Sequence, residues 1–155
     1  NTTMYLFLAL GAAACIGAAG KALESGIEYI KERRAFGSPL AKFEGMQFQV
    51  AENYMKLESA RLLVYKAAWM LDQMYTNNRF SHKEINKAVA SAKLIAPTVA
   101  FDIIKDVLIW HGAYGYTKEA GLEKGLRGVA SYIMGAEGAQ NIMKLIISRE
   151  LLGKE

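Results

Sequence analysis

One carboxylate in this sequence has surroundings that suit acid–base chemistry. Glu137 lies in the apolar, glycine-rich segment IMGAEGA, at the start of the last predicted helix, which covers residues 137–152. A carboxylate at a helix start is stabilised by the helix dipole. If the fold removes water from it, the same group becomes a stronger base and can abstract a proton. An ordinary helix-start glutamate explains the pattern equally well, so the residues alone leave both interpretations open.

Two arginines form a second candidate site. Arg33 and Arg34 fall in the last turn of the first predicted helix, where cations suit the exposed carbonyls. Gly37 is expected to stop that helix, and Pro39 to start the next element with its φ already set. Two guanidinium groups beside Phe36, at a corner between helices, suit an anionic ligand or a partner carboxylate. The alternative is a solvated helix end with a core phenylalanine.

Other residue types that could do chemistry are sparse. Cys15 is the only cysteine and sits in an apolar run, so we expect an unreactive thiol, no internal disulfide and a reducing, cytoplasmic location. His82 and His111 are far apart in the sequence and no Glu-x-x-His pair occurs, so no metal site is predicted. His82 falls in a helix-cap region, where we expect it to be solvated.

Long helices are predicted to position these groups. The chain has 155 residues, 52% of them hydrophobic, and only two prolines, which suits a single helical domain. Apolar residues spaced by threes and fours predict an all-α fold, an antiparallel four-helix bundle with an extra short helix. The predicted helices cover residues 4–33, 40–75, 82–112, 119–127 and 137–152.

Three local signals refine the boundaries of these helices. Tyr75–Phe80 is predicted to be a loop because it contains paired asparagines. Ser81–Glu84 has the pattern of a capping box, which would open the third helix. Pro97 should kink that helix or locally break its hydrogen-bond ladder.

Charge patterning bears on the kind of partner. The net charge is +4 and the basic residues are scattered among acids, so no nucleic-acid surface is predicted. Residues 1–20 carry no charged side chain, which raises the alternative of a membrane span. The same helical pattern continues through Lys21, Glu24 and Glu28. We therefore expect a helix buried inside the bundle and no membrane span.

Three segments together carry a family resemblance. Tyr29–Leu40 (YIKERRAFGSPL), His111–Thr117 (HGAYGYT) and Glu137–Gly153 (EGAQNIMKLIISRELLG) resemble signatures of the acyl-CoA dehydrogenase family, in the family's order and at nearly its spacing. The segments match the C-terminal helical domain of the family. Residues 1–155 are accordingly expected to be that single domain, with the family's N-terminal helical domain and middle β-domain absent from the sequence.

The resemblance implies an activity and its partners. A glutamate of the family removes a proton from the α-carbon of an acyl-CoA thioester, and a hydride passes from the β-carbon to FAD. The product is the trans-2-enoyl-CoA, and an electron-transfer flavoprotein then takes the electrons. Because the C-terminal domain contributes to the cofactor site of its neighbour, the resemblance also implies a homo-oligomer, a dimer or tetramer.

The same resemblance implies roles for individual residues. Glu137 matches the family's catalytic base. Arg33 matches an arginine that reaches the FAD pyrophosphate of a neighbouring subunit, and Phe36 matches a phenylalanine packed against that cofactor. Gly112 and Ala113 match the family's Gly-Gly turn, whose backbone lies against the pyrophosphate.

The sequence departs from the family pattern mainly at cofactor contacts. Glu44 and Ile109 stand where the family has glutamines, and Ala113 replaces the second glycine of the turn. Ala139 replaces the threonine of the family's Glu-Gly-Thr triplet and is the remaining cofactor-binding candidate. Further departures lie at Leu8, Gly128 and Met143.

These departures leave more than one function open. The spacing from Arg127 to Glu137 is one residue longer than the family's, which is a further departure at the base itself. The favoured hypothesis is an active FAD-dependent acyl-CoA dehydrogenase whose isolated domain is not active alone. The alternative is a non-catalytic partner subunit that has lost its FAD contacts and serves oligomer assembly. A flavin monooxygenase or oxidase on the same fold is a smaller third possibility.

Overall fold

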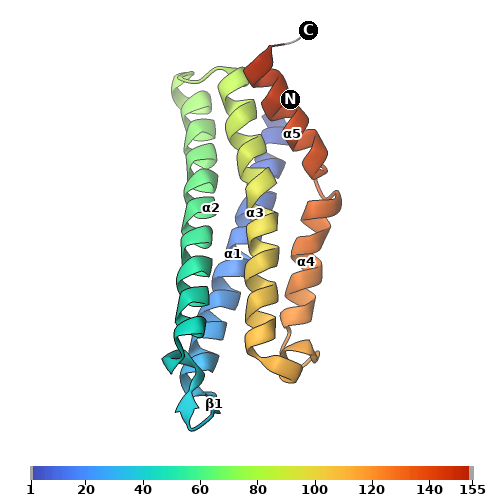
Figure 1. The fold of residues 1–155 in the computed structure, drawn as a ribbon. Helices are drawn as coiled ribbons and strands as arrows, with labels where there is room; N and C mark the ends of the chain where they lie inside the picture. The colour runs from blue at the N-terminus through green and yellow to red at the C-terminus, as the bar shows by residue number, and fades with distance from the viewer. Residues whose placement is uncertain (1, 154–155) are drawn as a thin grey trace.

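The computed structural model describes residues 2–153 and confirms an all-α fold. Its helices form an elongated bundle whose long members run antiparallel (Figure 1). A two-residue hairpin, β1 (Arg34–Ala35) paired with β2 (Ser38–Pro39), lies at one end. The α-helices are α1 (Thr2–Glu32), α2 (Glu44–Asn77), α3 (His82–Trp110), α4 (Leu122–Met134) and α5 (Gln140–Leu152).

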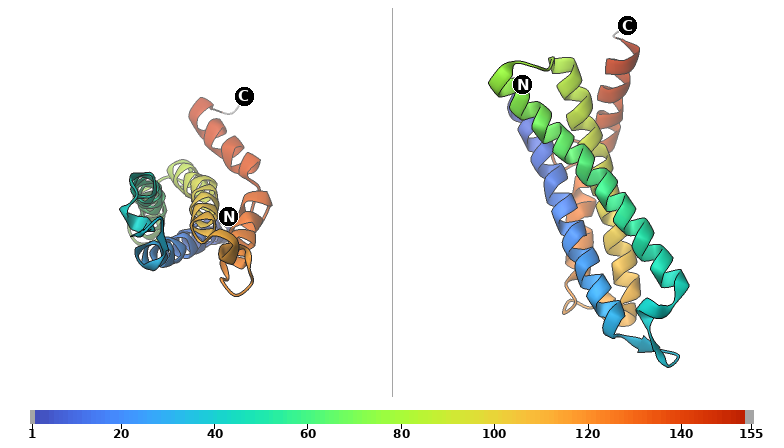
Figure 2. Two further views of the ribbon diagram at one scale, coloured as in Figure 1. Left: turned by 60° about the horizontal axis from the view of Figure 1, so that its bottom comes forward. Right: turned by 90° about the vertical axis from the view of Figure 1, so that its left-hand side faces the viewer.

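The fourth helix position of the bundle is occupied by two short helices instead of one long helix. α4 and α5 follow each other along the bundle axis, and both pack against α3 (Figures 1 and 2). α3 also packs against α1 and α2, so it is the central element. The helix predicted over 119–127 therefore begins and ends later, and the last helix begins at Gln140, not at residue 137.

Small residues allow α1 to approach α3 closely. Ala12 and Ala19 of α1 are completely buried, and so are Ala92 and Ala96 of α3. Length and composition alone would also allow α1 to cross a membrane, but 44% of its most apolar stretch is buried within the bundle. That burial fits the prediction of a bundle helix.

The corner after α1 differs from the prediction. α1 ends at Glu32, so Arg33 and Arg34 do not lie in a helical turn but lead into the hairpin. Phe36 and Gly37 form the hairpin turn, both with positive φ. Gly37 therefore serves a strand turn and does not end a helix. Pro39 precedes a short 3₁₀ helix over Leu40–Lys42, as expected for a residue that starts an element, and α2 follows.

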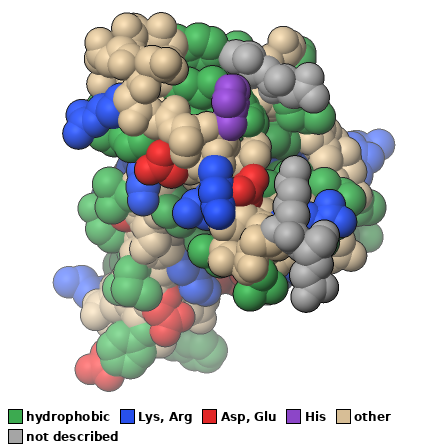
Figure 3. Space-filling model, turned by 90° about the horizontal axis from the view of Figure 1, so that it is seen from above, with side chains coloured by type: hydrophobic (Ala, Val, Ile, Leu, Met, Phe, Trp, Pro, Cys, Tyr) green, Lys and Arg blue, Asp and Glu red, His purple; other side chains and the backbone are tan. Residues whose placement is uncertain are grey.

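The connection from α2 to α3 is shorter than predicted. α2 continues to Asn77, and Asn78 ends it in the left-handed conformation that asparagine tolerates. The capping box is confirmed, because the Ser81 and Glu84 side chains each bond the other's backbone N–H. His82 is exposed, as predicted. Seen from this end, acidic and basic side chains are mixed with hydrophobic ones (Figure 3).

α3 continues through Pro97 as one helix. Proline has no N–H, so the ladder loses the bond that this position would donate to the carbonyl of Lys93. Pro97 is buried and the helix runs on to Trp110. The predicted local break in the ladder is thus limited to one missing bond, and packing on three sides keeps the helix continuous.

Candidate functional site

Glu137 lies in the turn that joins α4 to α5. α4 ends in a wide turn, where the carbonyl of Ser131 accepts hydrogen bonds from both Gly135 and Ala136. Glu137 then has φ +61°, and Gly138 has φ +127°. Because α5 begins only at Gln140, Glu137 is not in its first helical turn, and the predicted dipole stabilisation at a helix start is wrong.

The Glu137 backbone is in a conformation that side chains rarely adopt. Among the described residues, the non-glycine residues with positive φ are Phe36, Asn78 and Glu137. Asn78 ends a helix, which explains its conformation. The other two are candidate site residues from the sequence. Positive φ costs about 1–3 kcal/mol at a non-glycine residue and is concentrated at functional sites.

The Glu137 side chain reaches across to α1. Its carboxylate oxygen Oε2 lies against Gly11, in the space that a β-carbon at this position would occupy, and the ring of Tyr132 borders the same space. Leu8, one turn earlier, packs near the backbone of Gly138. Glu137 as a whole is exposed on this bundle. The carboxylate is therefore fixed on one side and open on the other.

A buried lysine lies beneath the same turn. Lys93 of α3 is only 1% exposed. Its Nζ donates hydrogen bonds to the carbonyl oxygens of Tyr132 (2.9 Å) and Gly138 (3.4 Å), and it lies 5.4 Å from the centre of the Tyr132 ring. Burial lowers the pKa of this ammonium group, while the electrostatic interactions with Cys15 and Glu137 oppose that shift.

Cys15 lies one helical turn after Gly11 and is close enough to Lys93 and Glu137 for both to influence its thiol electrostatically. Burial raises the pKa of its thiol to about 11, with Lys93 lowering it and Glu137 raising it. The thiol therefore stays protonated near neutral pH, in agreement with the expected unreactive, buried cysteine. Within residues 2–153, no cluster of metal-ligating side chains is found.

The hairpin presents the second group of candidates. Phe36 is 97% exposed at the tip, with its ring edge-on to Phe43 at a centroid distance of 6.3 Å. Arg34 donates a hydrogen bond from Nη2 to the carbonyl of Gly37 (2.8 Å) and so closes the turn. Arg33 is exposed and takes part in none of the ion pairs found among residues 2–153. Its guanidinium group is available to a ligand or partner.

The turn after α3 reaches the same end of the bundle. Gly112 has φ +60° and opens a short 3₁₀ helix over Gly112–Tyr116, with Gly112 and Ala113 exposed. His111 anchors this turn. Its ring stacks on Tyr29 of α1 at a centroid distance of 3.9 Å, and its Nδ1–H donates to the carbonyl of Val107 (2.8 Å).

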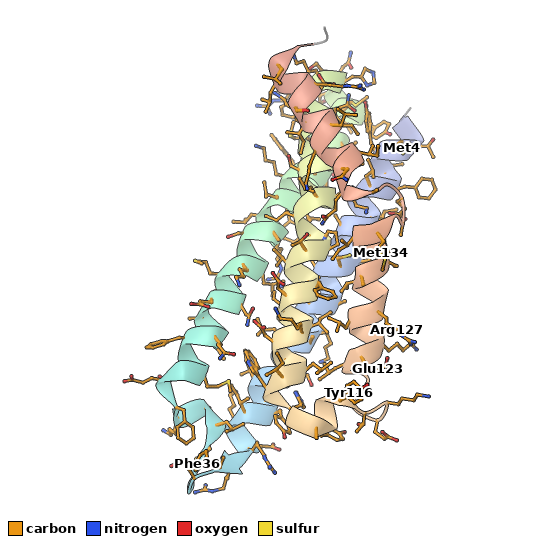
Figure 4. The ribbon with its side chains drawn as sticks, turned by 45° about the vertical axis from the view of Figure 1, so that its right-hand side comes forward. Met4, Phe36, Tyr116, Glu123, Arg127 and Met134 are labelled. Atoms are coloured by element: carbon orange, nitrogen blue, oxygen red, sulfur yellow. The ribbon has the colours of Figure 1, made fainter. Side chains whose placement is uncertain are left out.

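The candidates thus form two groups at different heights of the bundle. Arg33, Phe36, Gly112 and Ala113 lie at the hairpin end, whereas Glu137 and Ala139 lie in the turn held by Lys93. Lys93 and Trp110 are seventeen residues apart on α3, which is about 25 Å along the helix. Phe36 marks the lower group in Figure 4, and Met134, three residues before Glu137, marks the upper one.

The chemistry of the lower group fits the pyrophosphate of an FAD. An exposed guanidinium group pairs with phosphate oxygens in a fork, a glycine with positive φ lets backbone approach a phosphate, and an exposed phenylalanine offers a ring surface. These residues are Arg33, Gly112 and Phe36. Two further residues at positions of family cofactor contacts do not suit phosphate binding. Ile109 is apolar and 62% exposed, and Glu44 is an exposed carboxylate that would repel a phosphate.

Comparison with known proteins establishes the family. The model of the family domain described as "Acyl-CoA dehydrogenase, C-terminal domain" matches residues 8–152. The chain therefore belongs to the acyl-CoA dehydrogenase family, and its fold is that of the family's C-terminal helical domain, as the resemblance predicted.

Individual relatives agree with this assignment. The chain is 37% identical over 141 residues to the probable acyl-CoA dehydrogenase YngJ of Bacillus subtilis, covering 91% of this chain and 35% of the relative. It is 35% identical over 144 residues to the 3-(aryl)acrylate reductase of Clostridium sporogenes, covering 91% and 35%. The structure of butyryl-CoA dehydrogenase from Megasphaera elsdenii superposes with a TM-score of 0.87 at 30% identity, covering 97% of this chain and 37% of that one. The chain spans about a third of the length of these relatives.

Sequence reasoning missed two residues of the upper group. Lys93 shares a face of α3 with the buried residues Val89, Ala96 and Ala100. A single lysine on an otherwise apolar helix face indicates a buried charged group, and this signal was visible in the sequence. Gly11 lies among many small residues of α1, and nothing in its own segment indicates that a carboxylate lies against it.

Proposed function

We propose that this chain is the C-terminal domain of an FAD-dependent acyl-CoA dehydrogenase, with Glu137 as the base that removes the α-proton of an acyl-CoA thioester. The observation that carries this proposal is the setting of Glu137. It has a strained backbone, a carboxylate seated against Gly11, and an open side that a substrate could approach.

The chain's own residues contribute two functions to the proposed reaction. Glu137 takes the proton from the α-carbon and holds it on its carboxylate while the double bond forms. FAD, when bound, supplies the hydride acceptor for the β-carbon. Arg33, Phe36 and Gly112 would hold the cofactor of a neighbouring subunit, as the family resemblance implies, since they lie at the hairpin end of the bundle and not in the turn of Glu137. Ala139, beside the proposed base, contributes backbone but no hydroxyl group.

This division between two groups supports a homo-oligomer, because one protomer would supply the base of its own site and the phosphate contacts of another. An electron-transfer flavoprotein as electron partner and a cytoplasmic location remain proposals that follow from the resemblance and the cysteine usage.

A second candidate is the non-catalytic partner subunit. It is favoured by Ile109 and Ala139, which offer no side-chain polar group where the family has a glutamine and a threonine. Such a subunit would retain the fold and the assembly surfaces while binding no flavin. The two candidates differ in whether the protein binds flavin, which an absorbance spectrum measures directly.

The deciding experiment is the absorbance spectrum of the gently purified full-length protein, with and without added FAD. Bound flavin that bleaches anaerobically on addition of an acyl-CoA supports the dehydrogenase. A protein that binds no flavin even after reconstitution contradicts it and supports the partner subunit, which should then co-purify with a flavin-containing relative.

A further inference from the structure

The side chain of Lys93 joins the two ends of the turn that carries Glu137. One acceptor is the carbonyl of Tyr132, within the last turn of α4, and the other is the carbonyl of Gly138, directly after Glu137. The residues that separate these two acceptors are 133–137, so Lys93 bridges the base of a short loop. Both bonds come from one buried side chain on a different helix.

Placing an ammonium group here has a cost. A charged side chain that is 1% exposed loses nearly all of its hydration, and lysine is rarely buried unless it is paired. In this site the hydration is replaced by two carbonyl oxygens and by the face of the Tyr132 ring. An apolar residue of similar length would fill the same space among the alanines of α3 without this cost. The position therefore contains a lysine where packing alone would not require one.

The turn needs such support because its backbone is strained. Glu137, a non-glycine residue, has φ +61°, and α5 begins only at Gln140. A strained conformation persists only when the surrounding structure holds it. The carbonyl of Gly138 is the group that Lys93 bonds, so release of that bond would free the backbone at the carboxylate.

We propose that Lys93 is a positioning residue for Glu137: its ammonium group ties the turn between α4 and α5 to α3 and so fixes the carboxylate against Gly11. This inference rests on the proposed function for the role of the carboxylate. The holding of the turn by Lys93 is a separate statement about the structure and can be tested without turnover.

The variant Lys93→Met in the full-length protein removes the ammonium group and keeps the unbranched side chain. The matched control is Lys83→Met, an exposed lysine of the same helix. Two measurements are made on each protein. The first is hydrogen exchange of the amides of Gly135, Ala136 and Gly138, which all have hydrogen-bond acceptors in or beside the turn. The second is stopped-flow flavin reduction by a saturating acyl-CoA, together with the dissociation constant of that ligand.

Loss of two bonds from a charged donor should raise exchange at the three amides by about tenfold to a hundredfold, while amides of α1 and α3 keep their protection. The limiting rate of flavin reduction should fall by at least about tenfold with the dissociation constant unchanged, because the base is misplaced but the substrate is not. Lys83→Met should change neither measurement.

Unchanged exchange at the turn in Lys93→Met would overturn the holding role. Faster exchange with an unchanged reduction rate would overturn the positioning role. If Lys93→Met does not fold, Lys93→Leu, which also removes the donor, replaces it and is judged by the same two measurements. If the unaltered protein reduces no flavin with any acyl-CoA, the proposed function fails, and exchange alone still decides whether Lys93 holds the turn.

Discussion

The carboxylate of Glu137 occupies the space where a β-carbon of residue 11 would lie, so Gly11 forms one wall of its seat. The contact joins α1 to the turn before α5, two segments at opposite ends of the sequence. Helix interiors disfavour glycine by about 1 kcal/mol relative to alanine, so packing or function must compensate for it. At position 11, the missing side chain leaves the space that the Glu137 carboxylate occupies, and we take this contact as the reason for the glycine.

Gly11→Ala should therefore lower activity without unfolding the domain. The new methyl group meets the far end of a flexible glutamate side chain, which can move away, although the Tyr132 ring also lies 3.0 Å from it. We expect the gain in helix propensity to offset most of that crowding, so that the unfolding free energy changes by less than about 1 kcal/mol. Flavin reduction by acyl-CoA should slow at least about tenfold. The measurements are urea unfolding and anaerobic stopped-flow absorbance.

Gly17→Ala is the matched control for this substitution. Gly17 lies on the same helix, and nothing lies within 4 Å of the position of its β-carbon. The control should stabilise α1 by up to about 1 kcal/mol and leave the reduction rate unchanged. Equal rates in both alanine variants would show that the seat at Gly11 has no catalytic importance.

Glu137→Gln should abolish proton abstraction while keeping the fold. The amide has nearly the same shape but no basicity, so the rate of flavin bleaching should fall by about 10²- to 10⁴-fold. Ligand affinity should change little, because the substitution alters chemistry more than shape. Glu52→Gln, at an exposed position of α2, provides the control. If the flavin of Glu137→Gln bleaches at the normal rate, Glu137 is not the base, and the base is another residue or lies in another domain.

Helix periodicity predicted the bundle well because long apolar patterns dominate this chain. The capping box at Ser81 was predicted correctly, since its two residues, Ser81 and Glu84, lie only three positions apart in the sequence. The end of α1 was predicted wrongly. A glycine with positive φ serves a helix end and a hairpin turn equally well, and Gly37 serves the hairpin. Only the pairing of Arg34 with Pro39, which depends on the whole corner, separates the two.

The upper site was only partly predictable. Glu137 stands out in its own segment, but its position relative to a helix start depended on where α5 begins. The bonds from Lys93 reach carbonyls 39 and 45 residues away along the chain. Backbone carbonyls occur at every residue, so no sequence pattern identifies the ones that accept. The buried lysine could be suspected from its apolar neighbours, whereas its acceptors required the fold.

Adjacent arginines of the hairpin should have different functions. Arg34 closes the turn by donating a hydrogen bond to the carbonyl of Gly37. Arg33 takes part in none of the ion pairs found among residues 2–153. Arg33→Met should lower the flavin content of the purified full-length protein and weaken FAD binding about tenfold or more, with unchanged thermal stability. Arg34→Met should loosen the hairpin first, seen as faster amide exchange over residues 34–38.

The comparison between the two variants tests the lower group. Phe36→Ala is a third arm, since a side chain that is 97% exposed contributes little to folding of this bundle. Its loss should reduce flavin content as the loss of Arg33 does. Full flavin content in both Arg33→Met and Phe36→Ala would contradict a cofactor role for the hairpin and favour the partner-subunit hypothesis.

The thiol of Cys15 should make the folded state sensitive to alkaline pH. Its pKa is raised from 9.0 to about 11 by burial, so the unfolded chain loses this proton first. Stability from the buried thiol is complete below pH 9 and is lost as the pH rises from 9 to 11, by about 2 kcal/mol in all. Urea unfolding at pH 8 and pH 10.5 should show this loss in the unaltered protein and a smaller loss in Cys15→Ala. The same pH dependence in both proteins would assign the alkaline transition to other groups.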